Sequence, residues 1–384
     1  MQTATKTASP TASPTPAADC AAEVLGSTPL RVWGLTSNER IQRQLARAGV
    51  ASAHATRPSR GLLLRADWVY DDALVKALAA AGTDTALVCD DEVVGLNVQA
   101  SLLDESRALL PSGRAPQGCR RLGAAELADA YNNVLRKREP PYLMHLTAES
   151  LPAVERRVFG GAYKGVTDLV TLYVWPRPAL YVTKLCANAG ITPNQVTSAS
   201  LVLVFAAMAC FWTGHHVWGL LAAWPMTFLD TVDGKLARVT LRSTKFGDVF
   251  DHAIDLVHPP FWWWAWIVGL PAAGMPVDNA SLLLWTIVGG YVLQRIEEGI
   301  FIASFGMDMH VWQRFDSRFR LITARRNPNL LLLTAAVLAG RPDLGIIAVA
   351  VWTAASLLVH LLRIVQAALA RRRGPLRSWL AARV

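Results

Sequence analysis

The segment FLDTVDGKLARVTLRSTKFGDVFDHAID, residues 228–255, contains five aspartates, and four of them, Asp230, Asp233, Asp251 and Asp255, form two pairs at helical spacing. Asp230 and Asp233 are three residues apart, so they share one face if this part of the chain is helical. Asp251 and Asp255 are four residues apart and share a face of the next helix in the same way. Two facing pairs would make a pocket of four carboxylates. Like charges this close disfavour the ionised form, so the pocket requires cations.

The donor set of this pocket predicts the kind of cation. Oxygen ligands with no histidine or cysteine among the four suit Mg²⁺ or Mn²⁺. We expect two such ions, which beside Arg238 would make a clamp for a diphosphate. Gly234 and Ala237 on one side, and Gly247 on the other, would let a ligand or a neighbouring helix approach the backbone closely.

The chain around this pocket divides into a polar part and an apolar part. Residues 1–165 are polar and mixed, whereas long apolar runs dominate from residue 195 onward. Hydrophobic residues make up 52% of the 384 residues and charged residues only 17%, which is too apolar for an ordinary soluble protein. The net charge of +9 comes from basic residues at the ends of apolar runs, which indicates a membrane protein and not a nucleic-acid-binding protein.

Six apolar stretches predict transmembrane helices, since a span needs about 20 apolar residues. They cover residues 195–213, 216–237, 246–271, 281–305, 329–340 and 343–368, and the fifth is short. Basic residues gather between the second and third stretch, between the fourth and fifth, and after the sixth. Both termini and the aspartate hairpin are therefore predicted to be cytoplasmic, in an inner or plasma membrane.

A tryptophan-rich run, FWWWAW at residues 261–266, lies 16 to 21 residues past Lys245. This separation is about 24 to 32 Å along a helix. It predicts that the tryptophans lie at the far membrane interface, where tryptophan is favoured. Pro259 and Pro260 are expected to kink the helix just before them.

The aspartate segment resembles the complete signature of the CDP-alcohol phosphotransferases: Asp230-x2-Asp233-Gly234-x2-Ala237-Arg238-x8-Gly247-x3-Asp251-x3-Asp255. GITPNQVT, residues 190–197, is similar to the segment that leads into the family's first span. YKGVTDLVTLYVWPRPALYVTKLCANAG, residues 163–190, resembles the connector of members with an N-terminal nucleotidyltransferase-like domain, such as the di-inositol-phosphate phosphate synthases. We therefore expect residues 163–186 to lie on the membrane surface.

The resemblance implies a reaction and a role for each signature residue. A CDP-alcohol binds with its diphosphate on the metal ions, an acceptor hydroxyl attacks the β-phosphorus, and CMP leaves. The implied roles are metal binding by Asp230, Asp233, Asp251 and Asp255, general-base catalysis by Asp255, and shaping of the nucleotide pocket by Gly234, Ala237, Arg238 and Gly247.

The partners implied are a CDP-alcohol donor and a hydroxyl acceptor, either a lipid or a sugar-alcohol phosphate. Phospholipid biosynthesis is the expected context, with membrane lipids around a homodimer and no nucleic acid. Two alternatives stay open. One is an inositol-phosphate-type transferase that makes an inositol phosphodiester, and the other is a bifunctional enzyme with an active N-terminal cytidylyltransferase.

Two non-enzymatic roles for the aspartates fit the sequence less well. Structural salt bridges with Arg238, Arg242 and Lys245 would not require this spacing or the glycines. An ion pathway would place ionisable groups near mid-bilayer on several helices, whereas these cluster at one surface. The sequence favours the enzyme.

Three arginines further along are candidate ligands of an acceptor phosphate. Arg295 lies in the fourth apolar stretch, three residues before Glu298, so it could equally form a structural ion pair. Arg325 and Arg326 end a basic segment, residues 314–329, that would attract anionic lipid or flank the acceptor entrance.

The N-terminal part predicts a small α/β domain over residues 28–140, with a largely parallel sheet. The expected strands are 30–35, 61–67, 85–90 and 92–98, and the expected helices are 38–48, 71–81, 99–109 and 124–137. The run LLLRADWVYDDALVKAL, residues 62–78, resembles the nucleotidyltransferase-like domain of some family members.

That domain is predicted to be degenerate. In active cytidylyltransferases a Gly-rich phosphate loop follows the first strand, and the corresponding place, residues 34–43, has one glycine and no such cradle. Asp67 is the acidic residue placed as a metal ligand would be. The predicted organisation is a disordered tail (1–27), the α/β domain (28–140), a linker with interfacial helices (141–192), the six-helix domain (193–370) and a basic tail (371–384).

Overall fold

The computed structural model describes residues 17–52 and 58–381 and divides the chain into two units. The first unit contains residues up to Ala130 together with Pro140–Val158. The second contains Tyr131–Glu139 and everything from Phe159 onward. The predicted boundary at residue 140 therefore differs from the observed division, because a short hairpin from the middle of the chain belongs to the second unit.

The first unit is built on a six-stranded sheet in the order β4-β1-β5-β8-β7-β9. Its strands are β1 (Ala17–Leu25), β4 (Val50–Ser52), β5 (Arg60–Arg65), β7 (Thr85–Cys89), β8 (Glu92–Gln99) and β9 (Arg120–Gly123). Three pairings are parallel, β1 with β4, β1 with β5 and β7 with β9, whereas β8 pairs antiparallel with both β5 and β7. The α/β class is confirmed, but the sheet is mixed.

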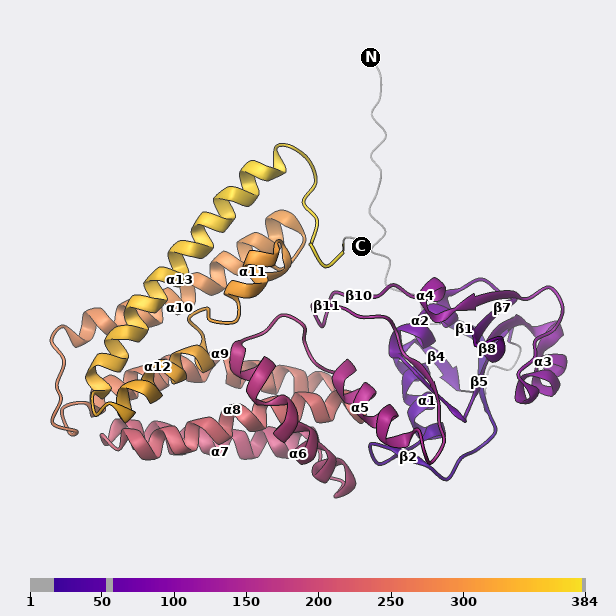
Figure 1. The fold of residues 1–384 in the computed structure, drawn as a ribbon, viewed down its shortest axis with the longest axis horizontal. Helices are drawn as coiled ribbons and strands as arrows, with labels where there is room; N and C mark the ends of the chain where they lie inside the picture. Colours follow the sequence, from indigo (N-terminus) through magenta and orange to yellow (C-terminus); the bar gives the residue numbers. More distant parts are fainter. Residues whose placement is uncertain (1–16, 53–57, 382–384) are drawn as a thin grey trace, which may run out of the picture. The chain divides into compact units, whose positions relative to one another are not determined.

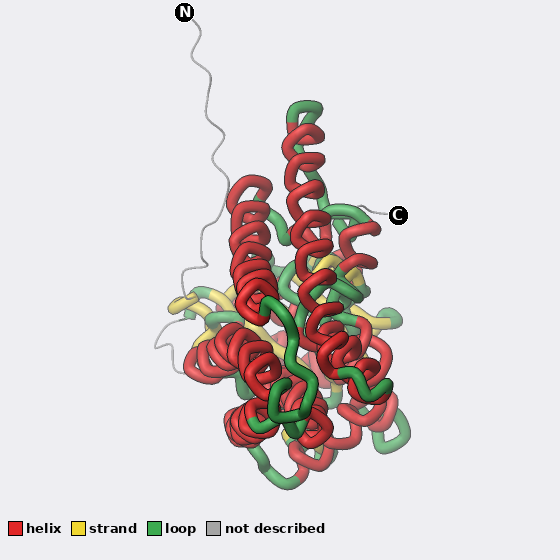
Figure 2. Tube along the Cα trace, turned by 90° about the vertical axis from the view of Figure 1, so that its left-hand side faces the viewer, coloured by secondary structure: helices red, strands yellow, loops and turns green. Residues whose placement is uncertain are grey.

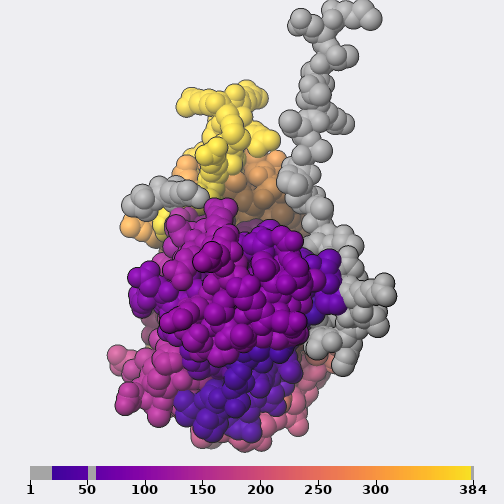
Figure 3. All heavy atoms as spheres, turned by 90° about the vertical axis from the view of Figure 1, so that its right-hand side faces the viewer, coloured from indigo at the N-terminus to yellow at the C-terminus, as the bar shows by residue number. Residues whose placement is uncertain are grey.

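The sheet carries apolar side chains on both of its faces. Leu62 and Leu64 pack with helices α1 (Ser37–Arg47) and α2 (Asp72–Ala80), and Leu63 packs on the opposite face with α3 (Leu103–Leu109) (Figure 1). A continuous apolar run is what a strand covered on both sides requires. Figure 3 shows one face of this unit, coloured indigo to purple.

Several predicted boundaries of this unit were wrong. Residues 17–25, assigned to a disordered tail, form β1 between β4 and β5, although AADCAAEVL has few strand-favouring residues. The rest of that tail, residues 1–16, lies outside the described residues. The predicted first strand, residues 30–35, is the small hairpin of β2 (Arg31–Val32) and β3 (Leu35–Thr36).

The predicted helix over residues 124–137 was also wrong beyond its first turn. Helix α4 ends at Leu127, and β10 (Tyr131–Asn132) and β11 (Lys137–Arg138) follow it. The remaining elements of this part are β6 (Trp68–Tyr70), β12 (Leu143–His145), α5 (Leu151–Gly161) and two 3-10 turns, η1 (Ala100–Leu102) and η2 (Leu110–Ser112).

The second unit is largely helical, and each of the six predicted apolar stretches is a helix. They are α7 (Pro193–Trp212), α8 (His216–Val239), α9 (Lys245–Gly269), α10 (Ala280–Phe305), α12 (Arg326–Leu338) and α13 (Pro342–Arg371). The connector before them forms η3 (Val170–Val174) and α6 (Pro176–Asn188), and the basic loop contains η4 (Met309–Val311) and α11 (Arg314–Phe319). Helices α10 and α13 run side by side (Figures 1 and 2).

Within the described residues, two helices are long and apolar enough to cross a membrane by length and composition: Pro193–Trp212 and Pro342–Arg371. Helix α12 has 13 residues, about 20 Å, which is shorter than the hydrocarbon core of a bilayer. The count of six transmembrane helices therefore stays a prediction.

Three tryptophans of the run pack in the core of the bundle and do not face outward, while their predicted place at the far membrane interface stays a prediction. Trp262, Trp263 and Trp266 are at most 1% exposed. Two of their indole N–H groups donate to backbone carbonyls, Trp262 to Val204 (2.9 Å) and Trp266 to Pro342 (3.2 Å). These partners satisfy the polar end of each ring, which allows tryptophan to be buried completely.

Helices α7, α8 and α9 form the part of the bundle that carries the aspartates. Helix α7 begins with a capping box, in which Thr192 accepts from the backbone of Gln195 and the Gln195 side chain accepts from Thr192. At its other end it approaches α9 so closely that a Cβ at Gly269 would lie 1.8 Å from the carbonyl oxygen of Phe211. Only glycine permits this approach.

The C-terminal segment, predicted as a basic tail, folds back onto the loop between α10 and α12. Ser378 donates to the carbonyl of Val311 (2.7 Å), and the Trp379 indole donates to Ser317 (2.9 Å). Leu380 is 7% exposed and packs with Val311 and other apolar residues. The segment therefore fixes the loop that carries the arginines described below.

We predict that Leu380→Ala destabilises the second unit by about 2 kcal/mol, because it leaves a cavity against Val311. Thermal unfolding of the detergent-solubilised protein measures this as a lower Tm. Val134→Ala is the control, since Val134 is 83% exposed. Equal Tm values for the two variants would contradict the packing of the C-terminal segment.

Candidate active site

Three of the four predicted carboxylates come together where α8 lies beside α9. Asp230, Asp233 and Asp251 each offer an oxygen, and these atoms lie within 4.8 Å of one another. The spacing along α8 places Asp230 and Asp233 on one face, and the start of α9 brings Asp251 to them. We call these three residues the carboxylate cluster.

Helix α7 orients the most buried member of the carboxylate cluster. The Thr197 hydroxyl donates to one oxygen of Asp233 (2.6 Å), and the backbone N–H of Gly234 donates to the other (2.5 Å). Asp233 is only 3% exposed, so these bonds fix the carboxylate in place. Thr197 was not predicted as a site residue, although it ends the GITPNQVT segment that resembles the family.

Asp255 lies outside the carboxylate cluster and is paired with an arginine. Arg326, at the start of α12, donates through Nη1 to Asp255 (2.5 Å) and through Nη2 to Asp230 (2.5 Å). Its guanidinium group therefore bridges the two aspartates. Arg326 was predicted as a ligand of an acceptor phosphate, and the structure gives it two carboxylate partners.

A small cavity of about 40 Å³ adjoins the carboxylate cluster and contains three of the residues predicted to shape a nucleotide pocket: Gly234, Ala237 and Gly247. A Cβ at Gly247 would lie 2.7 Å from the side-chain oxygen of Asn194, and one at Gly234 would lie 3.1 Å from the Arg238 guanidinium. Both glycines thus leave room for a polar side chain. The Nε of Arg238 is buried and makes no hydrogen bond within the described part of the chain.

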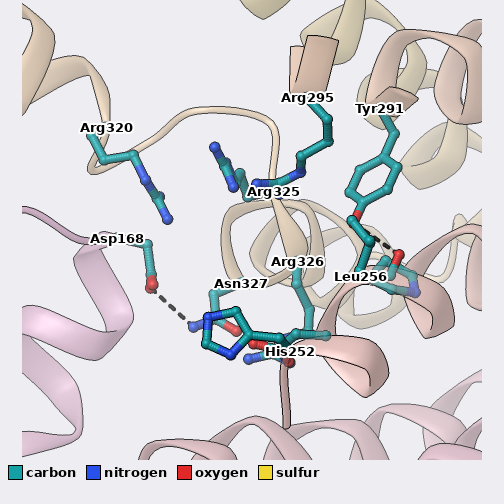
Figure 4. A pocket seen from close by; sticks show the side chains of 11 residues that line it. Asp168, His252, Leu256, Tyr291, Arg295, Arg320, Arg325, Arg326 and Asn327 are labelled. Carbon is teal, nitrogen blue, oxygen red and sulfur yellow. Dashed lines mark hydrogen bonds and ion pairs between the residues drawn. The ribbon is translucent and has the colours of Figure 1, made fainter. Parts of the chain in front are cut away.

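A second cavity, of about 300 Å³, opens on the other side of Asp255 (Figure 4). Four arginines line it: Arg295, Arg320, Arg325 and Arg326. The other lining residues are Asp168, His252, Asp255, Leu256, Pro259, Tyr291 and Asn327. We call this space the arginine cavity. Its charge suits an anionic ligand next to the aspartates.

Arg325 and Arg295 share one acidic partner, Glu298. The Arg325 guanidinium forms a close ion pair with Glu298, and Arg295 lies 3.4 Å from the other oxygen of the same carboxylate. Arg295 also lies over the ring of Tyr291. The predicted ion pair of Arg295 is confirmed, and Arg295 lines the cavity as well, so both interpretations of this residue have a structural basis.

Arg320 is the cavity arginine with the least compensation. Its Nε and Nη1 atoms are buried and make no hydrogen bond within the residues the structure describes. Burial and the neighbouring Arg325 lower the pKa of Arg320 to about 9, so it remains a cation at neutral pH. An anion in the cavity would relieve both effects. Arg320 was not predicted from the sequence, because nothing in the basic loop separates it from the other arginines.

The connector also contributes to the arginine cavity through Asp168, which was not predicted from the sequence. Asn327 donates to its carboxylate (3.0 Å), as Figure 4 shows, and so does the Thr171 hydroxyl (2.8 Å). Burial opposes ionisation of Asp168, but Arg320 and these hydrogen bonds outweigh it and lower its pKa. Asp168 therefore ties the connector to the start of α12.

His252 is a further lining residue that was not predicted. Its Nδ1 lies 2.7 Å from the carbonyl oxygen of Asp248, so Nδ1 carries the proton and donates. The His252 side chain lines the arginine cavity together with Asp255. In the sequence, the position of His252 between the signature residues Asp251 and Asp255 could have identified it as a site residue.

The residues present fit a divalent cation. The carboxylate cluster supplies only oxygen ligands, and Asp233, its most buried member, is oriented by one hydrogen bond to each oxygen, from Thr197 and from Gly234. The carboxylate cluster lies between a small polar cavity and a larger cationic cavity. An oxygen donor set beside a cationic cavity suits a divalent ion and a phosphate ester.

Comparison with known sequences agrees with the geometry. Residues 190–317 match the sequence model of the CDP-alcohol phosphatidyltransferase family. The chain therefore contains a domain of this family, as its signature predicts.

Relatives with known names match about a third of the chain. The chain is 34% identical over 116 residues to phosphatidylinositol phosphate synthase of Mycobacteroides abscessus, which is 29% of this chain and 52% of that protein. It is 28% identical over 117 residues to archaetidylinositol phosphate synthase of Pyrococcus horikoshii, 30% of this chain and 59% of that protein. The chain thus spans little more than half the length of these relatives.

A third relative matches a longer part of the chain. It is the bifunctional IPC transferase and DIPP synthase of Rubrobacter xylanophilus, 25% identical over 202 residues, which is 53% of this chain and 44% of that protein. This match agrees with the predicted subgroup of the family.

Two predictions concern the first unit: Asp67 at the place of a metal ligand, and residues 34–43 at the place of a phosphate loop. Asp67 follows β5, and its carboxylate accepts from Arg65 (2.5 Å) and lies 3.4 Å from His145. The loop after the first strand is not residues 34–43, as predicted, because β1 ends at Leu25. That loop begins at Gly26, which has a positive φ of 83° and is the one glycine before β2. It is still no glycine-rich cradle.

We predict that Thr197→Val weakens the affinity for Mn²⁺ about 10- to 100-fold, because it removes the hydroxyl that orients Asp233. Electron paramagnetic resonance of free Mn²⁺ during a titration measures this affinity. Ser198→Ala is the matched control, since the neighbouring Ser198 hydroxyl donates only to its own helix backbone at Asn194. Unchanged affinity in Thr197→Val would contradict the assignment of this site.

Proposed function

We propose that the protein is a membrane transferase that moves a phosphoalcohol group, most simply a phosphatidyl group, from a CDP-alcohol to an acceptor hydroxyl and releases CMP. The observation that carries this proposal is the carboxylate cluster on α8 and α9, whose residues lie within the stretch that matches the family model. Phospholipid biosynthesis is the context that the names of the relatives support.

The donor nucleotide is assigned to the side of the cluster with the small cavity. Gly234, Ala237 and Gly247 line this cavity, and the uncompensated Nε of Arg238 lies beside Gly234. The Asp230, Asp233 and Asp251 carboxylates would hold Mg²⁺ or Mn²⁺, which supplies charge stabilisation for the attacking and leaving oxygens when bound. The glycines admit the nucleotide because a side chain there would fill the space.

Proton transfer is assigned to Asp255, which faces the arginine cavity. The carboxylate would accept the proton of the acceptor hydroxyl as that oxygen attacks the β-phosphorus. Arg326 holds Asp255 in a fixed orientation through its 2.5 Å contact. His252, with Nε2 as an acceptor, lies at the same cavity and can relay the proton onward.

The acceptor is proposed to carry an anionic group, as a sugar-alcohol phosphate does. Arg320 supports this, because two of its nitrogens are buried in the wall of the arginine cavity without a hydrogen-bond partner among the described residues. Two relatives are named phosphatidylinositol phosphate synthase and archaetidylinositol phosphate synthase. These names support inositol phosphate as the first acceptor to test. A neutral lipid alcohol would supply no negative charge to these two nitrogens.

The protein is proposed to cross an inner or plasma membrane with six helices, as a homodimer, with both termini and the carboxylate cluster on the cytoplasmic side. Basic residues after α8, after α10 and after α13 support this orientation. The first unit is proposed to serve in docking or regulation. Its candidate metal ligand, Asp67, is already engaged by Arg65, and its first loop has no glycine-rich cradle.

We predict that Asp255→Asn lowers kcat for CMP release by roughly 10²- to 10⁴-fold, because the amide cannot accept the proton. Asp230→Asn should abolish CMP release, as should an excess of chelator. The measurement is CMP formation by purified protein with a panel of CDP-alcohols and acceptors. Asp278→Asn, at an exposed loop position, is the control. Full activity of Asp230→Asn in a folded protein would exclude the proposed mechanism.

We predict that Arg320→Ala raises the acceptor KM about 10- to 150-fold, the effect of losing one charge-assisted contact of about 1.5 to 3 kcal/mol. The KM for the CDP-alcohol should be almost unchanged. Arg318→Ala is the matched control, because Arg318 is exposed on the same loop. An equal loss for both substrates, together with a lower Tm, would indicate a structural role for Arg320 instead.

The same assay separates the two interpretations of Arg295. The double substitution of Arg295 and Glu298 by apolar residues removes both partners of this pair, so neither of these two charges is left without the other. Arg325 loses a partner as well, so Glu298→Gln alone is measured beside it. Normal acceptor KM in the double variant would show that Arg295 binds no acceptor phosphate.

A further inference from the structure

A second group of side chains with metal-ligand chemistry is distinct from the carboxylate cluster. Glu298 on α10, His310 on η4 and His360 on α13 each offer one ligand atom, and these atoms lie within 4.8 Å of one another. Both imidazoles are buried, His310 at 2% and His360 at 1% exposure. None of the three residues is part of the aspartate signature. We call them the histidine cluster.

His360 is the member of the histidine cluster that calls for a ligand. Neither of its ring nitrogens makes a hydrogen bond within the part of the chain that the structure describes, although the side chain is buried. A neutral imidazole has one donor and one acceptor, and burying both without a partner is costly. The Glu297 carboxylate lies 3.7 Å from Nδ1, which is too long for a hydrogen bond. A species bound within the cluster would supply a partner.

The donor set suits an ion that prefers nitrogen ligands. Two histidines and one glutamate are a recurrent set for Zn²⁺, with water in the fourth position. Bonds of about 2.0 to 2.1 Å place tetrahedral ligands roughly 3.4 Å apart, and His310 Nε2 already lies 3.3 Å from an oxygen of Glu298. Histidines that bind a metal commonly donate through their other nitrogen to a carboxylate. Glu297, beside Nδ1 of His360, is the candidate for that role.

Glu298 can bind an ion and keep its arginine partners. A carboxylate has about four lone-pair sites, and Arg325 and Arg295 each pair with one of its two oxygens. The two guanidinium groups place positive charge beside the cluster, which disfavours an ion such as Mg²⁺ that is held mainly by charge. An ion that gains its affinity from imidazole nitrogens is disfavoured less. The histidine cluster should therefore select Zn²⁺ over Mg²⁺.

We propose that the histidine cluster binds one transition-metal ion of the Zn²⁺ type, separately from any ion at the carboxylate cluster. The ion joins three parts of the chain: α10, the loop that follows it and α13. The same loop carries Arg320 and ends at Arg325, two residues that line the arginine cavity. The bound ion thus fixes one wall of that cavity. The proposal goes beyond the proposed function and does not rest on it.

Cobalt(II), which binds where Zn²⁺ does and absorbs strongly in the visible range when four-coordinate, tests the proposal. Purified full-length protein in detergent, without an affinity tag, is titrated with Co²⁺ in excess Mg²⁺, which occupies sites made only of oxygen ligands. We expect one equivalent of Co²⁺ with this absorption, which Zn²⁺ abolishes by displacement. His310→Gln and His360→Gln should each weaken Co²⁺ binding more than about 100-fold, because each removes a direct ligand.

Two further variants serve as controls. His215→Gln changes an exposed histidine, and Asp233→Asn changes the carboxylate cluster, so both should keep the Co²⁺ absorption. Zn²⁺ should also raise the Tm of the wild type and of Asp233→Asn, but not that of His310→Gln, because a ligand that binds only the folded state stabilises it.

Absence of the Co²⁺ absorption in the wild type would overturn the proposal and would leave an ordered water as the partner of His360. Full absorption in a folded His310→Gln or His360→Gln variant would also overturn it, and His310→Gln decides alone if His360→Gln does not fold. Loss of the absorption in Asp233→Asn would place the ion at the carboxylate cluster instead. Absence of CMP release from protein that shows the absorption would count against the transferase function alone.

Discussion

The repulsion among four carboxylates within one helix pair is the constraint on which the rest of the second unit depends. Asp230, Asp233 and Asp251 have oxygens within 4.8 Å of one another, and Asp255 lies one turn further along α9. Such a group persists only if cations surround it. The arginines at the start of α12 and the end of α8 meet this need from the chain itself, and the remaining charge calls for a divalent ion.

The bundle holds this charged centre with apolar packing on one side and polar contacts on the other. The close approach of α7 and α9 at Gly269 and the buried indoles of Trp262 and Trp266 fix the helices at the end remote from the aspartates. Thr197 then reaches Asp233 from α7. A rigid frame of this kind lets a carboxylate keep one rotamer, which a metal ligand requires.

The four arginines that line the arginine cavity differ in their acidic partners. Arg326 bridges two aspartates, Arg325 and Arg295 share Glu298, and Arg320 has two nitrogens without a hydrogen bond in the described part of the chain. Electrostatic compensation therefore decides which cation can attract a further anion. The C-terminal segment and the connector both pack on the loop around Arg320, so parts of the chain distant in sequence determine its position.

The sequence alone determined the chemistry of the centre and the helices that carry it. Fixed spacing on a helix decides which aspartates share a face, and apolar runs of helical length decide where α7 to α10, α12 and α13 lie. It also determined the α/β class of the first unit, though not β1, whose alanine-rich residues form a strand because they lie between two others. Only the tertiary structure decided the pairing of Arg326, the role of Thr197, the burial of the tryptophans and the exposure of Arg320 to the cavity. These depend on contacts between residues far apart in the chain, for which local spacing carries no signal.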